Sequence, residues 1–201
     1  MSSQTEDRKS ALLADIEKLI AAKTSAAQRA RAQVFAAKYC SEIDVDDFVA
    51  RDATEWAALS LSHLAFSNEF QRGAPKMRIF NPRQTDNGWE RACTVIEFVN
   101  DDMPFLVDSI AMEINRQGIA IQLVLHPLFD ASRDEHGILI ELDDAKSGNR
   151  IESWMHVEVE RITDPARIKA LGDGLVSVLG DVRAAVDDFA AMKGKDRKSV
   201  V

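Results

Sequence analysis

Three acidic side chains at one turn are the residues of this chain that are best suited to recognition chemistry. Asp101 and Asp102 precede Pro104, and Asp108 follows one helical turn later, in the stretch VNDDMPFLVDSIAMEIN at 99–115. Pro104 fits the first turn of a helix, and an acid just before it can cap the free backbone N–H groups. Capping would explain Asp102, but it would not explain the carboxylates of Asp101 and Asp108. Because the protein supplies the negative charge here, a ligand at this turn should present an amino group or another cation.

The helix expected over residues 104–117 is apolar on two sides. Its core stripe repeats at helical spacing and comprises Met103, Leu106, Val107, Ile110, Ala111 and Ile114. At about 100° per residue, Phe105 and Met112 fall almost opposite this stripe. A second surface must cover them, either the N-terminal helices of the chain or another subunit. We expect the N-terminal helices to provide this cover.

Histidine and glutamate residues offer a second, weaker candidate site. Those that could meet on one sheet are Glu97, His126, His156, Glu158 and Glu160. Neither histidine has the spacing of paired metal ligands. His156 alternates with Met155 and Val157, which predicts a half-exposed position. We therefore expect no catalytic residue and no metal site, and an enzyme with its own chemistry at Glu97, His126 and His156 is the alternative.

Phosphate-binding motifs for a nucleotide cofactor are missing from the sequence. The segment GDGLVSVLG at 172–180 departs from the G-x-G-x-x-G spacing and lies within a helical pattern. No G-x-x-x-x-G-K-[ST] loop occurs either. We expect no cofactor to bind to this segment.

The composition excludes several classes of partner. The 201 residues are 46% hydrophobic, and 33 acidic against 25 basic residues give a net charge of −8. This charge argues against nucleic acid and against anionic membranes. Cys40 and Cys93 are the only cysteines, the N-terminus has no signal-peptide pattern, and no apolar run approaches the roughly 20 residues of a membrane span. We expect a cytoplasmic protein whose partners are small molecules or other proteins.

The elements that must position these residues fall into two parts. Residues 10–72 are rich in Ala, Leu, Glu, Gln and Arg and contain no proline or glycine, which predicts three or four packed helices. After Gly73 and Pro75 the hydrophobic period changes from helical to alternating. The expected strands are MRIFNP (77–82), CTVIEFV (93–99), IAIQLVLHPLFD (119–130, bent near Pro127), ILIEL (138–142) and SWMHVEVER (153–161). A final helix should begin at Asp164-Pro165.

This order of elements predicts an α+β fold. An antiparallel sheet should carry two helices on one face, in a ferredoxin-like arrangement, with the N-terminal helical segment packed against it. We divide the chain into a helical segment over 1–73, an α+β domain over 74–192 and a disordered tail over 193–201.

Several blocks of sequence resemble a known family. They are MRIFNP, the following GW, TVIEFVNDDMPFLVDSI, NRQGIAI, LHPLFD, and ESWMHVEVER with DP behind it. They look like the N-terminal region of the large bacterial NAD-specific glutamate dehydrogenases, where this region resembles an ACT-type regulatory module. The resemblance implies a non-catalytic regulatory or architectural segment of an enzyme that converts glutamate, NAD and water to 2-oxoglutarate, ammonia and NADH. The implied partners are other domains of that enzyme, further subunits of a homo-oligomer and, where the module senses a ligand, an amino-acid effector.

The same resemblance implies a possible role for the acidic turn at 101–108. Many ACT modules bind an amino acid between the first strand and the first helix, at a motif resembling D-x-P-G-x-L. Here DMPFL places Phe105 where the glycine would let a ligand approach the backbone. Amino-acid sensing and a ligand-free scaffold for subunit or interdomain contacts both stay open. The candidate residues for ligand binding or interface contact are Asp101, Asp102, Phe105, Asp108 and Met112.

One strand of the ACT pattern has no clear counterpart. ACT folds add a strand after the second helix, and KGKDRKSVV at 193–201 is a poor strand. That sheet edge is missing, occupied by the strand expected at 77–82, or supplied from outside this sequence.

Overall fold

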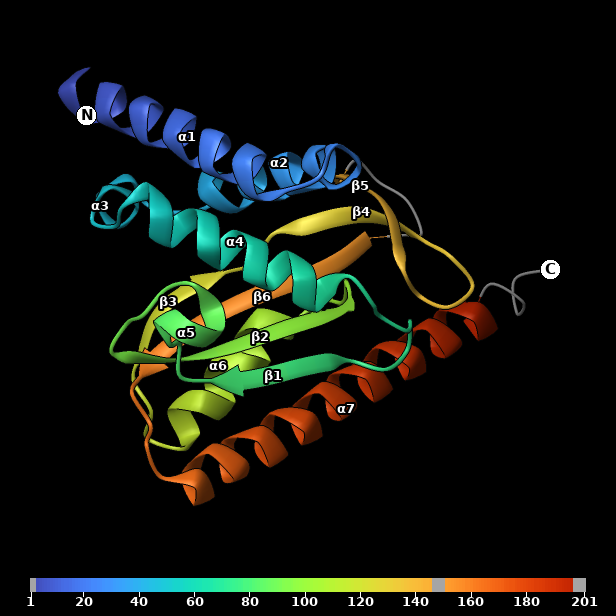
Figure 1. The fold of residues 1–201 in the computed structure, drawn as a ribbon. Helices are drawn as coiled ribbons and strands as arrows, with labels where there is room; N and C mark the ends of the chain where they lie inside the picture. The colour runs from blue at the N-terminus through green and yellow to red at the C-terminus, as the bar shows by residue number, and fades with distance from the viewer. Residues whose placement is uncertain (1–2, 146–150, 197–201) are drawn as a thin grey trace.

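The chain folds as an antiparallel sheet of six strands between two layers of helices (Figure 1). In this computed structural model the described residues are 3–145 and 151–196. The first four helices cover one face of the sheet, and α6 and α7 cover the other. The α+β class is therefore confirmed, with the N-terminal helices on the sheet and two helices on its opposite face.

The N-terminal layer contains α1 (Ser3–Lys23), α2 (Ala26–Ser41), α3 (Val45–Val49) and α4 (Ala53–Ser67). Aspartate carboxylates cap the last two of these helices. Asp44 accepts a 3.0 Å hydrogen bond from the N–H of Asp46, and Asp52 accepts one of 2.8 Å from Glu55. Apolar side chains on the inner sides of the four helices are buried against the sheet, among them Ile16, Ile20, Phe35, Phe48, Trp56 and Leu59.

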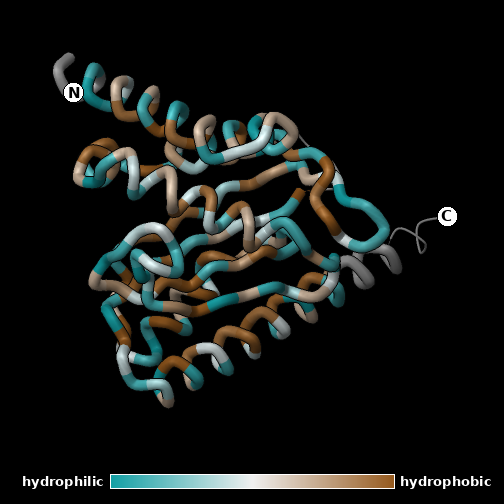
Figure 2. The backbone as a smooth tube through the Cα atoms, viewed as in Figure 1, coloured by the Kyte–Doolittle hydropathy of each residue, from teal (hydrophilic) through white to brown (hydrophobic). Residues whose placement is uncertain are grey.

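The sheet is built from β1 (Lys76–Phe80), β2 (Cys93–Asp101), β3 (Ile121–Leu125), β4 (Leu128–Arg133), β5 (Leu139–Asp144) and β6 (Ile151–Glu160), with the short helix α5 (Gln84–Asn87) between β1 and β2. The strand order is β1-β2-β6-β4-β5, and β3 also pairs with β6. The break between β3 and β4 at Pro127 confirms the predicted bend. Figure 2 shows hydrophobic residues recurring along the strands between the helical layers.

The edge of the sheet beside β2 is formed by β1. The two strands are antiparallel, with Arg78 opposite Glu97 and Phe80 opposite Val95. Of the three alternatives for the missing ACT strand, the structure therefore selects the one in which the strand expected at 77–82 occupies this edge.

The second helical layer comprises α6 (Leu106–Arg116) and α7 (Pro165–Asp196). Its core joins side chains of both helices to the apolar side chains of the strands, including Leu106, Ile110, Ile114, Leu171, Leu175, Leu179, Phe98, Met155 and Val157. The predicted stripe of α6 is thus confirmed for its three central residues. Gly118 follows α6 with φ 69°, a conformation that glycine adopts without strain.

The bounds of two helices differ from the sequence prediction. Helix α6 begins at Leu106 and not at Pro104. Helix α7 continues to Asp196, so residues 193–196 are helical and not part of a disordered tail. The rest of the expected tail, 197–201, lies outside the described residues. Across the ranges that the structure describes, every helix is too short or too polar to span a membrane.

Candidate functional site

The turn before α6 has a different geometry from the one predicted. Phe105 is the N-cap residue, with φ 69°, and its side chain makes no capping hydrogen bond. Asp102 is exposed, and its N–H donates to the carbonyl oxygen of Ile151 at 3.1 Å. The expected cap by Asp102 is therefore wrong, because α6 begins three residues later than such a cap requires.

Asp101, at the end of β2, is hydrogen-bonded to two other parts of the chain. Its carboxylate accepts hydrogen bonds from the N–H of Gly73 at 2.8 Å and from the Arg183 guanidinium at 3.0 Å. Arg183 also donates to the side-chain oxygen of Asn100 at 2.9 Å. Asp101 thus joins the connection between α4 and β1, the end of β2 and the middle of α7. Its carboxylate is committed to groups of its own chain.

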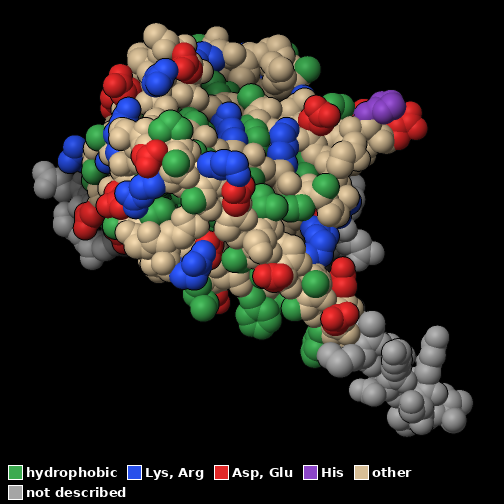
Figure 3. All heavy atoms as spheres, turned by 90° about the horizontal axis from the view of Figure 1, so that it is seen from below, with side chains coloured by type: hydrophobic (Ala, Val, Ile, Leu, Met, Phe, Trp, Pro, Cys, Tyr) green, Lys and Arg blue, Asp and Glu red, His purple; other side chains and the backbone are tan. Residues whose placement is uncertain are grey.

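Phe105 and Met112 lie on the outer side of α6, and each is 72% exposed. The expectation that the N-terminal helices cover them is wrong, because those helices pack on the opposite face of the sheet (Figure 1). Asp102 and Asp108 are exposed as well. Figure 3 shows the side of the molecule formed by α6 and α7, where hydrophobic side chains are interspersed with charged ones.

A buried charged network connects the segment between α3 and α4 with the sheet. Arg51 donates two hydrogen bonds of 2.7 Å to the carboxylate of Glu158. His156 Nε2 lies 3.2 Å from Glu158, and its Nδ1 lies 3.1 Å from Glu97. The Nε of Arg78 donates to Glu97 at 2.6 Å. We call these five residues the charged network, and they link β1, β2, β6 and the segment before α4.

The residues of this network on β2 and β6 are inaccessible to solvent. Glu97, His156 and Glu158 are at most 1% exposed, so the half-exposed position predicted for His156 is wrong. Alternation did place His156 and Glu158 on one face, but helices cover that face. A second buried pair lies on the same face, where Arg133 donates two 2.8 Å hydrogen bonds to Glu152.

The charge states in the network follow from its hydrogen bonds. Burial alone would lower the pKa of His156, but hydrogen bonds to Glu158 and Glu97 outweigh it and raise this pKa. Burial likewise opposes ionisation of both glutamates, yet neighbouring positive groups hold the pKa of Glu97 and of Glu158 at about 2. The network therefore places His156 between two carboxylates, each of which also accepts a hydrogen bond from a guanidinium group.

His63 is a buried histidine that the sequence analysis missed as a site residue. It lies on α4, is 0% exposed, and has its Nδ1 4.0 Å from Glu97. Burial lowers the pKa of His63 to about 4, so its ring is neutral. Its spacing from Trp56, Leu59 and Phe66 is typical of an apolar helix stripe. The only signal in the sequence was a polar ring within that stripe.

His126 is separate from this network. It lies at the bend between β3 and β4, and its backbone N–H donates to Glu42 at 3.2 Å. The alternative site built from Glu97, His126 and His156 is therefore not assembled as expected: the structure brings together Glu97 and His156, with His63 in the third position.

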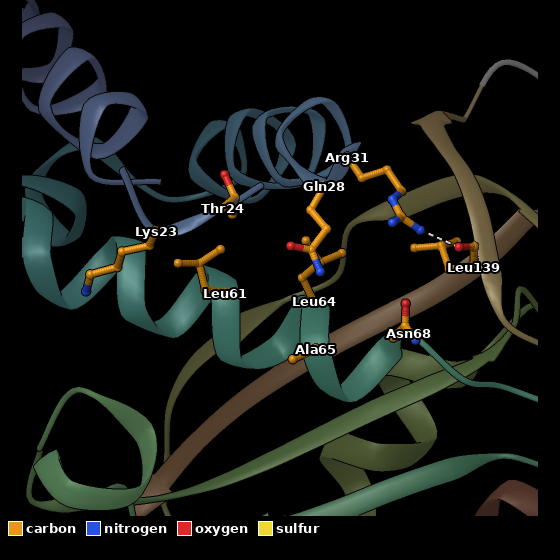
Figure 4. A pocket seen from close by; sticks show the side chains of 9 residues that line it. All are labelled: Lys23, Thr24, Gln28, Arg31, Leu61, Leu64, Ala65, Asn68 and Leu139. Carbon is orange, nitrogen blue, oxygen red and sulfur yellow. Dashed lines mark hydrogen bonds between the residues drawn. The ribbon is translucent and has the colours of Figure 1, made fainter. Parts of the chain in front are cut away.

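A pocket of about 390 Å³ lies between α2, α4 and β5 (Figure 4). Arg31 reaches the carbonyl oxygen of Leu139 and donates a hydrogen bond to it. The ammonium group of Lys23 lies at the other end of the pocket and points away from Arg31. The two cations do not converge, so the pocket has no focus for an anionic ligand.

Comparisons with known proteins agree on one family. Residues 35–175 match the family model described as glutamate dehydrogenase, ACT1 domain. The chain is 33% identical over 168 residues to the NAD-specific glutamate dehydrogenase of Pseudomonas aeruginosa, covering 82% of this chain and 10% of that protein. It is 28% identical over 198 residues to the NAD-specific glutamate dehydrogenase of Halomonas elongata, covering 97% of this chain and 12% of that protein. The chain thus spans about a tenth of the length of these curated relatives.

Proposed function

Since this chain belongs to the ACT1-domain family of glutamate dehydrogenases, we propose that it is a non-catalytic, architectural or regulatory N-terminal region of a cytoplasmic NAD-dependent glutamate dehydrogenase. The reaction of the parent enzyme, from glutamate, NAD and water to 2-oxoglutarate, ammonia and NADH, belongs to other parts of that enzyme. The names and lengths of the relatives support this assignment, because the chain corresponds to about a tenth of each of them.

The outer side of α6 is the observation that supports a contact role. Met112 lies within α6 and Phe105 is the residue just before it, and both side chains are largely exposed. Exposed acids, Asp102 and Asp108, flank this apolar pair. A complementary partner would present an apolar groove with basic residues at its rim. We assign this partner to a further domain of the same enzyme.

The backbone at Phe105 supports the same role. A bulky residue with φ 69° is strained, and glycine would relieve that strain. The ring buries little surface within the chain, because 72% of it is exposed. Local stability therefore gives no reason for a phenylalanine here, whereas a contact with another domain does.

An amino-acid effector is less well supported at this turn. Recognition of an ammonium group needs an available carboxylate, but that of Asp101 accepts hydrogen bonds from Gly73 and Arg183. Asp102 and Asp108 are exposed to solvent, which would weaken their attraction for a cation. We therefore favour the contact role over sensing.

The test compares variants of the full-length parent enzyme. Phe105→Gly and Met112→Ala, combined in one double variant, should not lower the melting temperature of the isolated chain, and should disturb interdomain packing in the parent. Protease protection and glutamate-dependent NADH formation report that packing. Ile140→Ala is the matched control, since Ile140 is 55% exposed on β5. Wild-type behaviour of the double variant in both assays would contradict the contact role.

The isolated chain tests the non-catalytic assignment separately. Mixed with glutamate and NAD, it should form no NADH above the rate without protein. Turnover that copurifies with this polypeptide would overturn the assignment. Saturable binding of an amino acid that Asp101→Asn and Asp108→Asn abolish together would favour sensing instead.

A further inference from the structure

Three potential metal ligands from separate elements meet inside the protein. His63 comes from α4, Glu97 from β2 and His156 from β6, and one ligand atom of each lies within 4.8 Å of the others. All three side chains are at most 1% exposed. In the part of the chain that the structure describes, this is the one such group of three or more His, Cys, Asp or Glu side chains.

Several polar atoms around this group lack a well-formed hydrogen bond within the described residues. They are both ring nitrogens of His63 and the hydroxyl of Tyr39, all of them buried. The Tyr39 ring stands edge-on to both imidazoles, with its centroid 5.8 Å from that of His63 and 5.9 Å from that of His156. Buried polar groups in proteins are nearly always paired, so these atoms indicate that a further group belongs here.

The surrounding residues orient the three ligands. Arg78 binds Oε2 of Glu97, which leaves Oε1 facing His156 Nδ1 at 3.1 Å and His63 Nδ1 at 4.0 Å. Glu158 lies at Nε2 of His156 and is itself fixed by Arg51. A carboxylate on the far nitrogen of a histidine is the outer-shell arrangement that positions metal-binding imidazoles.

We propose that His63, Glu97 and His156 bind a divalent transition-metal ion of the zinc type, with a water molecule in the fourth position. Two imidazole nitrogens and one carboxylate oxygen suit zinc or cobalt, whereas magnesium and calcium prefer oxygen ligands alone. The ion takes the place of the proton between His156 Nδ1 and Glu97, and that proton passes to solvent. No electron transfer is involved.

This site would fasten the N-terminal helices to the sheet. His63 is on the helical layer and the other two ligands are on adjacent strands, paired directly opposite each other. The ion would therefore stabilise the docked arrangement by binding the folded state alone. This role is independent of the contact surface on α6.

Metal titration of the full 201-residue chain tests the proposal. Protein freed of metal with a chelator is titrated with Co²⁺, and a second sample is refolded from urea with Zn²⁺ so that burial does not block entry. We expect one equivalent of each ion, visible absorption bands of four-coordinate cobalt that Zn²⁺ abolishes, and a higher melting temperature with either ion.

Variants assign the ion to these ligands. His63→Gln removes a neutral ring without leaving a charge unpaired, and should abolish stoichiometric binding. Because His63 is fully buried, the metal-free melting temperature should fall as well, so binding is measured below it, and the variant should no longer gain stability from either ion. His126→Gln and His136→Gln are the controls and should bind as the wild type does. The proposal is overturned if neither direct titration nor refolding gives stoichiometric binding, if His63→Gln binds normally, or if a control variant loses the ion.

Discussion

Apolar side chains pack both faces of the sheet against their helices, but only one face also carries buried charges. On the face toward α6 and α7, β2 and β6 present apolar side chains such as Ile96, Met155 and Val157. One residue along the same strands, the other face presents Glu97, His156 and Glu158 to the N-terminal helices. Alternation in two paired strands thus produces an apolar interface on one side and a partly charged one on the other.

The two interfaces differ in how strictly they position the helices that pack on them. Apolar burial is strong but non-directional, so α6 and α7 are placed mainly by shape. The charged network accepts only the arrangement in which every carboxylate meets its partners, because an unpaired buried charge is costly. We infer that the network fixes the register of the N-terminal helices on the sheet.

Deletion of residues 1–72 gives the largest expected effect. It leaves Phe129, Trp154 and the buried carboxylates of the sheet without cover. A chain that starts at Gly73 should aggregate or unfold without a cooperative urea transition, as gel filtration and circular dichroism would show. Recovery of a monomer that melts at the temperature of the full chain would contradict the role of this interface.

The substitution Glu158→Gln should have the next largest effect on stability, because it removes one carboxylate from the charged network. Arg51 and His156 lose their shared counter-ion, so the free energy of unfolding should fall by about 3–5 kcal/mol. Urea denaturation measures this loss. Glu160→Gln is the control on the same strand, because the side chain of Glu160 is 45% exposed, and it should change stability by about 0.5 kcal/mol at most. If the two variants lost the same stability, disrupting the charged network would cost no more than changing an exposed glutamate.

Leu175→Ala tests the apolar interface by the same measurement. Leu175 is 0% exposed, and its truncation should lower the free energy of unfolding by about 2–5 kcal/mol. Leu175→Met should recover most of this loss, because apolar shape is what the site requires. Val176→Ala, at a position that is 57% exposed on the same helix, should have little effect. If Leu175→Met were as unstable as Leu175→Ala, the apolar interface would tolerate substitution as poorly as the charged interface does.

Labelling of the two native cysteines tests the interface with the smallest perturbation, because it requires no substitution. Cys40 and Cys93 both belong to the core under the N-terminal helices. Burial raises the pKa of each thiol from 9.0 to about 12, so at pH 8 the thiolate fraction falls by roughly three orders of magnitude. Thiol reagents should label the native protein only through opening of this layer.

Labelling at increasing urea concentrations then compares the two layers. If the charged interface opens first, labelling accelerates below the urea concentration at which the far-UV circular dichroism signal is lost. Labelling that follows the global transition would instead show that both layers unfold together.

The sequence by itself determined the elements and much of their packing. Helical spacing identified Leu106, Ile110 and Ile114 as the core of α6, and alternation placed His156 and Glu158 on one face. Local patterns are sufficient here because helix and strand periods state which residues share a side. Specific blocks of sequence also indicated the family.

Only the tertiary structure decided what covers each side. Nothing in the spacing shows that His63 lies beside Glu97 and His156, since the three belong to elements that are distant in sequence. The same holds for Asp101, whose partners come from Gly73 and Arg183, and for Phe105, which the N-terminal helices leave exposed. Periodicity reports the direction of a side chain from its own backbone, whereas its neighbours depend on how separate elements pack.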